Sequence, residues 1–173
     1  MRNLVLTAIG DDRPGLVEAL STTISAAGGN WLESSMAQLA GKFAGILRVT
    51  VPEDAADRLI AALTSMSALK VTVTSATEAA VPETARRLHL TLVGQDRLGI
   101  VREVSQVLVR HAVNVEELST LTSSAAMSGE TMFHAKASLQ GGPDLDAAAL
   151  QSDLEALSND LTVDITLDEV VLI

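Results

Sequence analysis

Two short turns of this 173-residue chain combine glycine, aspartate and arginine in a spacing that suits an anion. The first reads Gly10-Asp11-Asp12-Arg13-Pro14-Gly15, and the second, 84 positions later, reads Gly94-Gln95-Asp96-Arg97-Leu98-Gly99. Each turn precedes an amphipathic segment, so backbone N–H groups at the start of a helix would face a bound carboxylate. Arg13 and Arg97 can add a bidentate grip on the same group.

Carboxylates and amides expected near the two turns offer oxygen atoms to an ammonium group. Asp12 and Asp96 lie within the turns, and Asn30 and Asn114 begin the segments that follow the two helices. The same residue types also favour a tight strand–helix turn with a solvated arginine, which accounts for any one of them taken alone. The recurrence of the whole turn favours a ligand site or an interface region. The candidate ligand-binding residues are Gly10, Asp11, Asp12, Arg13, Pro14, Gly15, Asn30, Gln95, Asp96, Arg97, Gly99 and Asn114.

The residues around the turns repeat in one register, which indicates a duplicated unit. Leu4-Val5-Leu6-Thr7 returns as Leu88-His89-Leu90-Thr91. In each copy the apolar pattern predicts a strand, a helix, a two-stranded hairpin, a second helix and a closing strand, in the order βαββαβ. This order predicts an α+β fold of two ferredoxin-like domains, each a four-stranded antiparallel sheet with two helices on one face. We place the domains at residues 1–78 and 87–173, with a linker at 79–86.

The two copies are unequal. Asp12 is expected to cap the first helix, which ends at Gly28-Gly29. Ala112-Val113 replaces those glycines in the second copy, so the second helix stop is predicted to be weaker. The glycines of the two hairpin turns are 88 positions apart, which predicts a second hairpin longer by four residues and matches Arg48 with Lys136. If only one turn holds a ligand, we expect it to be the first.

Composition and charge argue against several classes of function. A net charge of −10 disfavours direct binding to nucleic acid. One Trp, two Phe and no Tyr leave few aromatic surfaces for stacking bases, which argues against an RNA-binding βαββαβ domain. The chain has no cysteine, and its three histidines lack ligand spacing, so we expect no metal and no cofactor. The first residues are apolar too briefly for a signal peptide, and no stretch approaches a membrane span, so we expect a cytoplasmic protein.

The two glycine-bounded turns, each followed by a helix and an Asn-led strand, resemble the opening of ACT domains. A chain made of two such domains is similar to the glycine cleavage system transcriptional repressor family. The resemblance implies a non-enzymatic sensor of a small amino acid, with glycine as one candidate, held where ACT domains meet. It also implies control of a partner protein such as a transcriptional activator, without direct contact with nucleic acid. Exposed sheet edges and a ligand site between domains favour side-by-side pairing of the domains, within a chain, between subunits or both, so we expect a homo-oligomer and no membrane contact.

An alternative function comes from the enzymes that carry similar domains. ACT domains with a related turn precede the catalytic parts of formyltetrahydrofolate deformylases and some phosphoserine phosphatases. The chain would then be a regulatory subunit or a relic of such an enzyme. Because the sequence has no nucleophile elbow, no P-loop and no dinucleotide fingerprint, we expect no catalytic residues and no enzyme activity. Either activity in the pure protein would overturn that expectation.

Overall fold

The computed structural model describes residues 1–76, 85–125 and 129–169. The chain divides into two units, Met1–Ala79 (unit 1) and Ala80–Ile173 (unit 2). Most of the linker expected at 79–86 lies outside the described residues, and the first strand of unit 2 already begins at Arg86.

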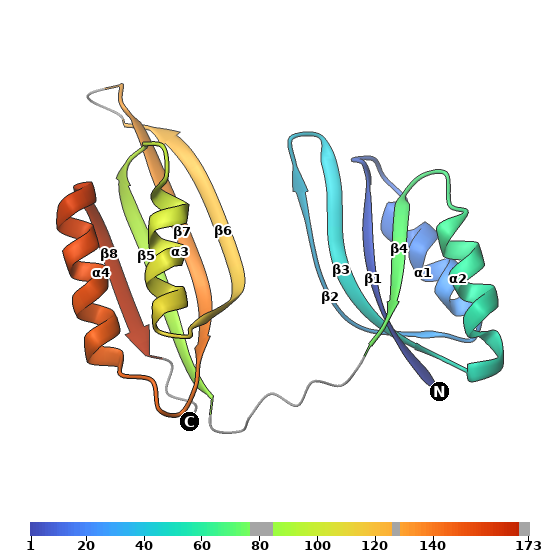
Figure 1. Ribbon diagram of the computed structural model, residues 1–173. Helices are drawn as coiled ribbons and strands as arrows, with labels where there is room; N and C mark the ends of the chain where they lie inside the picture. The colour runs from blue at the N-terminus through green and yellow to red at the C-terminus, as the bar shows by residue number, and fades with distance from the viewer. Residues whose placement is uncertain (77–84, 126–128, 170–173) are drawn as a thin grey trace. The chain divides into compact units, whose positions relative to one another are not determined.

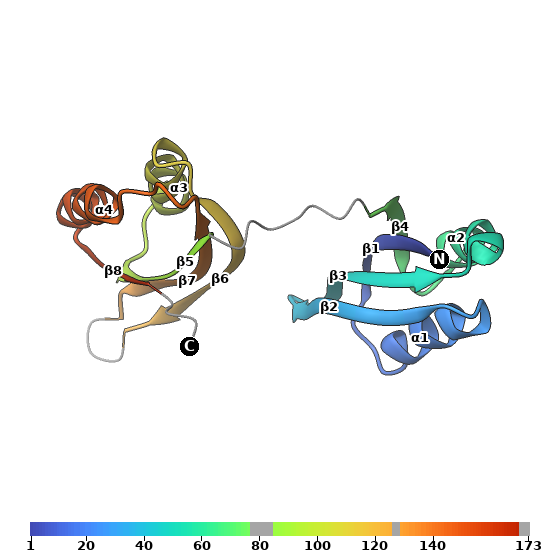
Figure 2. The same cartoon turned by 90° about the horizontal axis from the view of Figure 1, so that it is seen from below.

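Unit 1 is a four-stranded antiparallel sheet with two helices on one of its faces (Figures 1 and 2). The strand order across the sheet is β2-β3-β1-β4. Its elements are β1 (Arg2–Asp11), α1 (Leu16–Ala26), β2 (Asn30–Leu39), β3 (Lys42–Val51), the short 3-10 turn η1 (Glu53–Ala55), α2 (Ala56–Thr64) and β4 (Lys70–Ser75).

Unit 2 repeats this plan with the strand order β6-β7-β5-β8 (Figure 1). Its elements are β5 (Arg86–Gln95), α3 (Ile100–Arg110), β6 (Asn114–Ser124), β7 (Thr131–Gly141), α4 (Ala147–Leu161) and β8 (Val163–Glu169). The predicted fold class, two ferredoxin-like βαββαβ domains, is confirmed.

Alternation of apolar and polar residues explains why one face of each sheet carries the helices. On β1, Leu4 and Leu6 are fully buried, and they pack with Leu20 and Ile24 of α1. The intervening side chain of Val5 points to the opposite face, which we call the open face. Unit 2 has its own separate core, built in the same way around the leucines of β5.

Strand pairing corrects the predicted correspondence of the two hairpins. Glu33 pairs with Arg48 in unit 1, whereas the equivalent Glu117 pairs with Ser138 in unit 2. Arg48 and Ser138 are 90 positions apart, so the second hairpin is longer by six residues and not by four. The prediction was wrong because it aligned the turn glycines, whereas side-chain alternation fixes the register. Ser138, and not Lys136, is therefore the counterpart of Arg48.

The helices α1 and α3 end with the same backbone shape despite their different sequences. Gly28 follows α1 with φ of 71°, and Ala112 follows α3 with φ of 53°. In both cases the next N–H donates to the carbonyl five residues back, at 3.0 Å after α1 and 2.9 Å after α3. The C-terminal ends of α1 and α3 are thus hydrogen-bonded equally well. The two ends differ in backbone strain, because Ala112 is a non-glycine residue in a left-handed conformation.

Candidate functional site

The first candidate turn connects β1 to α1 in unit 1. Gly15 precedes the helix with φ of 94°, a left-handed conformation that strongly favours glycine. The N–H of Asp12 donates to the carbonyl of Gly41 at 2.9 Å, which fastens the turn to the β2–β3 hairpin. The turn therefore has a fixed position at one end of the sheet.

The first turn of α1 has no side-chain cap. Asp12 does not accept a hydrogen bond from the N-terminal N–H groups, because Gly15, three residues later, occupies the cap position. The prediction that Asp12 caps this helix is wrong. The helix α4 of unit 2, by contrast, has a side-chain cap, because Asp146 Oδ1 accepts a hydrogen bond of 3.0 Å from the N–H of Ala149. The uncapped N–H groups of α1 leave the partial positive charge of the helix available to an anion.

A pocket of about 560 Å³ opens beside this turn. Its lining combines the charged side chains of Asp12 and Arg13 with the apolar side chains of Leu16 and Phe43. Arg13 makes no hydrogen bond or ion pair with any residue that the structure describes. Its guanidinium is therefore free to bind a carboxylate in two-pronged fashion.

Asp11 differs from the other candidate residues of this turn because it already has a partner. Lys42 Nζ donates a hydrogen bond to the Asp11 carboxylate and forms an ion pair with it. This hydrogen bond, followed by the charge of Lys42, lowers the pKa of Asp11, and the charge of Arg13 adds to the effect. Asp12 is thus the better placed carboxylate for a ligand's ammonium group.

Asn30 lies at the other end of the sheet from the turn of its own unit. Asn30 pairs with Thr50, which pairs with Asn3, whereas Gly10 pairs with Phe43. At ~3.3 Å per residue, the seven steps along β1 from Asn3 to Gly10 span roughly 23 Å. The expectation that the asparagine lies near the turn is therefore wrong within a unit.

The second candidate turn, between β5 and α3, has the same backbone as the first. Gly99 has φ of 97°, and the N–H of Asp96 donates to the carbonyl of Thr131 at 2.8 Å. The side chains differ, because Arg97 Nη2 donates a hydrogen bond of 2.9 Å to Glu103 Oε2. Arg97 is therefore already bound to a carboxylate of α3, the helix that follows the turn.

The remaining candidates of unit 2 lie at the two ends of its sheet. Gln95, the last residue of β5, pairs with Met132 next to the turn. Asn114 pairs with Gln140, which pairs with Arg87 at the start of β5. As in unit 1, the asparagine and the turn do not meet within one unit.

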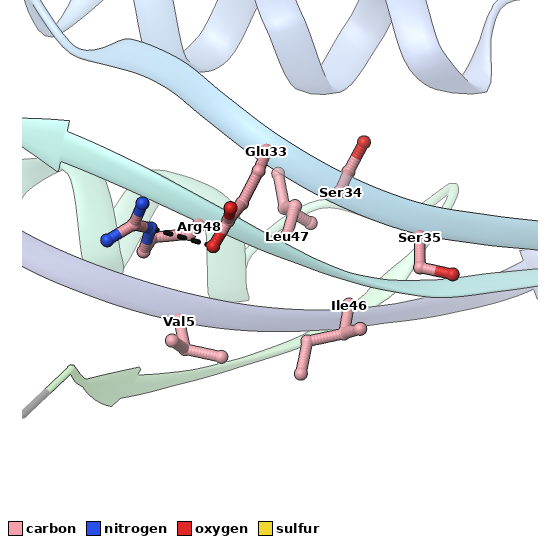
Figure 3. Close-up of a pocket in the computed structure, with 7 residues that line it drawn as sticks. All are labelled: Val5, Glu33, Ser34, Ser35, Ile46, Leu47 and Arg48. Atoms are coloured by element: carbon pink, nitrogen blue, oxygen red, sulfur yellow. Dashed lines mark ion pairs between the residues drawn. The ribbon is translucent and has the colours of Figure 1, made fainter. Parts of the chain in front are cut away.

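A second pocket, which the sequence reasoning missed, lies on the open face of unit 1. It has a volume of about 310 Å³, and its lining includes Val5, Glu33, Ile46 and Arg48. Arg48 Nε lies 2.9 Å from Glu33 Oε1 in an ion pair, which Figure 3 shows with Val5 and Ile46 beside it. The contact is ionic, because the N–H of Nε is not aligned to donate a hydrogen bond. Alternation along the strands places these residues on one face and is the signal that would have found the pocket.

Other kinds of site lack support in the described part of the chain. Within residues 1–76, 85–125 and 129–169, no group of three or more His, Asp and Glu side chains is placed to hold a metal ion. His134 Nε2 lies 2.8 Å from Ser123 Oγ, and His111 Nε2 lies 2.9 Å from Asp153 Oδ2. None of the helices in the same residues has the length and the apolar composition that crossing a bilayer requires.

The glycine-bounded turn of unit 1 lies within a stretch of the chain that matches a known family. The sequence model of the ACT domain matches residues 2–74, which cover unit 1 from its first strand into its last. Unit 1 therefore matches the ACT domain, and unit 2 repeats the fold of unit 1.

Comparison with individual proteins narrows the class, and the predicted resemblance is confirmed. The chain is 24% identical over 161 residues to the glycine cleavage system transcriptional repressor of Escherichia coli K12, covering 91% of this chain and 85% of that protein. A crystal structure of an unknown protein from Galdieria sulphuraria is 29% identical with a TM-score of 0.86, covering 98% of this chain and 99% of that one. A putative glycine cleavage system transcriptional repressor shares the fold with a TM-score of 0.73 at 21% identity, covering 99% and 98%. Over most of its length the chain is therefore similar to this repressor.

Proposed function

We propose that the protein is a non-enzymatic regulator that binds a small amino acid at the turn of unit 1 and controls a partner protein through that ligand. The similarity to a glycine cleavage system transcriptional repressor supports glycine as the ligand and a transcriptional regulator as the partner. A net charge of −10 supports action through a protein, because it repels the phosphates of DNA.

The pocket beside α1 is the observation that carries the proposal. Its volume of about 560 Å³ is typical of small-molecule sites. Donors for a carboxylate come from the uncapped N–H groups of the helix and from the guanidinium of Arg13, which has no partner among the described residues. Asp12 lines the same pocket and supplies an acceptor for an ammonium group. The set of groups matches the two charged ends of an α-amino acid.

Asn30 contributes to such a site only through another ACT domain. Its place at the far end of the sheet keeps it away from the turn of its own unit. A second ACT domain that packs beside the turn can bring its own asparagine to the ligand. We therefore propose that the ligand lies at an interface between ACT domains and that the protein is a homo-oligomer.

Isothermal titration of the pure protein with each of the twenty amino acids tests the ligand. We expect one of them, glycine first, to bind, and we expect Arg13→Ala to weaken that binding by about tenfold or more, because a charge-assisted hydrogen bond is lost. Arg58→Ala is the matched control, since Arg58 is an exposed arginine on α2 of the same unit. Failure of every amino acid to bind, or equal weakening by both substitutions, would contradict the proposal.

Affinity capture of cellular proteins, with and without the amino acid that binds, tests the partner. We expect a transcriptional regulator whose recovery changes with the ligand and becomes insensitive to it in Arg13→Ala. A ligand that leaves the set of captured proteins unchanged would argue against control of a partner.

A further inference from the structure

The arginine of the unit 2 turn is occupied, whereas the arginine of the unit 1 turn is not. Arg97 Nη2 lies 2.9 Å from Glu103 Oε2, and the two side chains are 43% and 27% exposed. Arg13 has the same place in unit 1 and makes no such contact with the residues described there. The position equivalent to Glu103 is Ala19, which has no carboxylate to offer.

The space above the turn glycine differs in the same way. A Cβ atom added to Gly99 would lie 3.3 Å from Glu103 Oε1 and 3.8 Å from Arg102 Nη2. The same atom added to Gly15 would meet nothing within 4 Å. The side chain of Glu103 therefore folds back over the turn of unit 2, whereas the turn of unit 1 is open.

Unit 1 also has a glutamate in the first turn of its helix, but that glutamate is engaged further along α1. Glu18 Oε1 accepts a hydrogen bond of 3.3 Å from Thr22 Oγ1. Glu18 thus leaves Arg13 unpaired, although it lines the pocket beside the turn. An acidic residue in the first turn of the helix is therefore not enough to bind the arginine of the turn. Glu18 lies one residue before Ala19, the equivalent of Glu103, and this difference in position leaves Arg13 without a glutamate partner among the described residues.

We propose that Glu103 takes the place of a ligand's carboxylate at Arg97, so that unit 2 is a self-occupied copy of the site and each chain binds one amino acid, at unit 1. This inference rests on the proposed function. A carboxylate on the helix that directly follows its arginine has a high effective concentration, and it competes with a free ligand without losing translational freedom. Both units thus have the backbone of the site, but in unit 2 Glu103 occupies the arginine that a ligand would bind.

Binding stoichiometry tests this inference directly, with glycine as the first probe and the other nineteen amino acids as parallel probes. Calorimetric titration of the wild-type chain is expected to give one amino acid per chain. Glu103→Ala frees Arg97 and is expected to raise the ratio to two. Arg13→Ala/Glu103→Ala is expected to return it to one, now at unit 2. Glu155→Ala is the matched control, because Glu155 is an exposed glutamate on α4 of unit 2 that bonds Gln151 and lies outside both turns, and its expected ratio stays at one.

The possible outcomes separate this inference from the proposed function. Two amino acids per wild-type chain, or a ratio that stays at one in Glu103→Ala, would overturn the inference and leave the proposed function in place. Arg97→Ala is expected to bind one amino acid per chain, and loss of binding there would also overturn it. Failure of all twenty amino acids to bind the wild-type chain would instead count against the proposed function. Circular dichroism verifies that each variant is folded, since an exposed ion pair contributes little to stability.

Discussion

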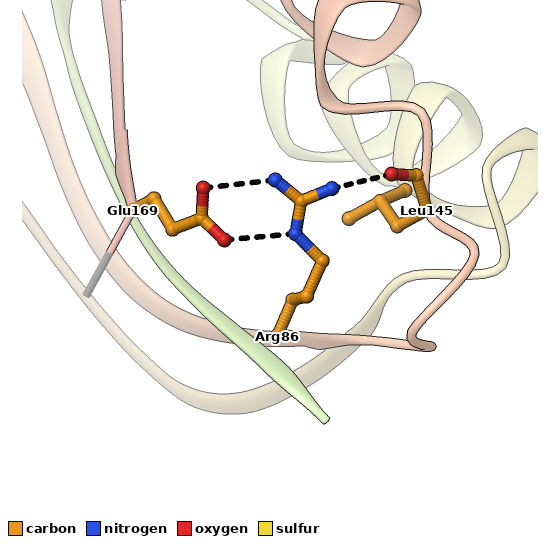
Figure 4. Close-up of polar contacts among 3 residues, drawn as sticks. All are labelled: Arg86, Leu145 and Glu169. Atoms are coloured by element: carbon orange, nitrogen blue, oxygen red, sulfur yellow. Dashed lines mark hydrogen bonds and ion pairs between the residues drawn. The ribbon is translucent and has the colours of Figure 1, made fainter. Parts of the chain in front are cut away.

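At the residue scale, the charged side chains around the two turns and the sheet ends differ in whether they have a partner within their own unit. Arg86 has such partners, because it binds Glu169 through two hydrogen bonds of 2.8 Å and also donates to the carbonyl of Leu145 (Figure 4). The side chains of Asp12 and Arg13 have none among the described residues. Asp12 and Arg13 are candidate ligand contacts because they also line the pocket beside α1.

Acid should destabilise unit 2 through its paired carboxylates. The hydrogen bond from Arg86 lowers the pKa of Glu169, and the hydrogen bond from His111 lowers the pKa of Asp153. Such a carboxyl stabilises the fold above its unfolded-state pKa, and this contribution is lost as the pH falls through the folded-state pKa. We therefore expect the unfolding temperature of unit 2 to fall as the pH drops below 4.5, the ordinary value for glutamate.

Thermal unfolding followed by circular dichroism between about pH 3 and pH 7 measures this dependence. Glu169→Gln removes one of the titrating carboxyls, so the unfolding temperature should fall less steeply with decreasing pH, a part of the curve that we call the acid limb. Glu155→Gln, on the exposed side of α4, should leave the limb as steep as in the wild type. Equal slopes in all three proteins would show that the Arg86–Glu169 pair contributes no pH dependence.

At the element scale, the ends of the helices show where the two units have diverged. Ala112 occupies the left-handed position after α3 that glycine occupies after α1. Ala112→Gly should stabilise unit 2 by about 0.5–1 kcal/mol, because relief of the left-handed strain exceeds the added entropy of the unfolded chain. Urea unfolding measures this change, and Gly28→Ala in unit 1 should be destabilising by a similar amount. A less stable Ala112→Gly protein would show that Ala112 is not strained.

The elements were predictable from sequence where a local pattern determines them. The βαββαβ order was predicted from three patterns. These are the alternation of apolar and polar residues around Leu4 and Leu6, the helical spacing of apolar residues from Leu16, and the repeat of both in the second half of the chain. The N-cap of α1 was mispredicted because the sequence pattern does not say whether Asp12 or Gly15 occupies that position. The left-handed φ of Gly15 makes Gly15 the N-cap residue. The contact between Arg97 and Glu103 was not predictable, because it depends on how two long side chains fold over the turn.

At the scale of the whole molecule, two hydrophobic cores that have none of the described residues in common indicate two independently stable units. A fragment of residues 1–79 should therefore fold and unfold cooperatively without unit 2. A fragment of residues 1–64, which lacks β4 and its core residue Val71, is the control and should not. Circular dichroism during heating distinguishes the two, and a fragment 1–79 without a cooperative transition would contradict the division.

The turn of unit 1 is the site at which we propose that an amino acid binds. Calorimetric titration of the full chain with glycine, and then with the other amino acids, tests this proposal most directly. We predict saturable binding that is weakened about tenfold or more by Arg13→Ala and is unaffected by Arg97→Ala. Absence of binding by every amino acid, or unaltered binding in Arg13→Ala, would contradict it.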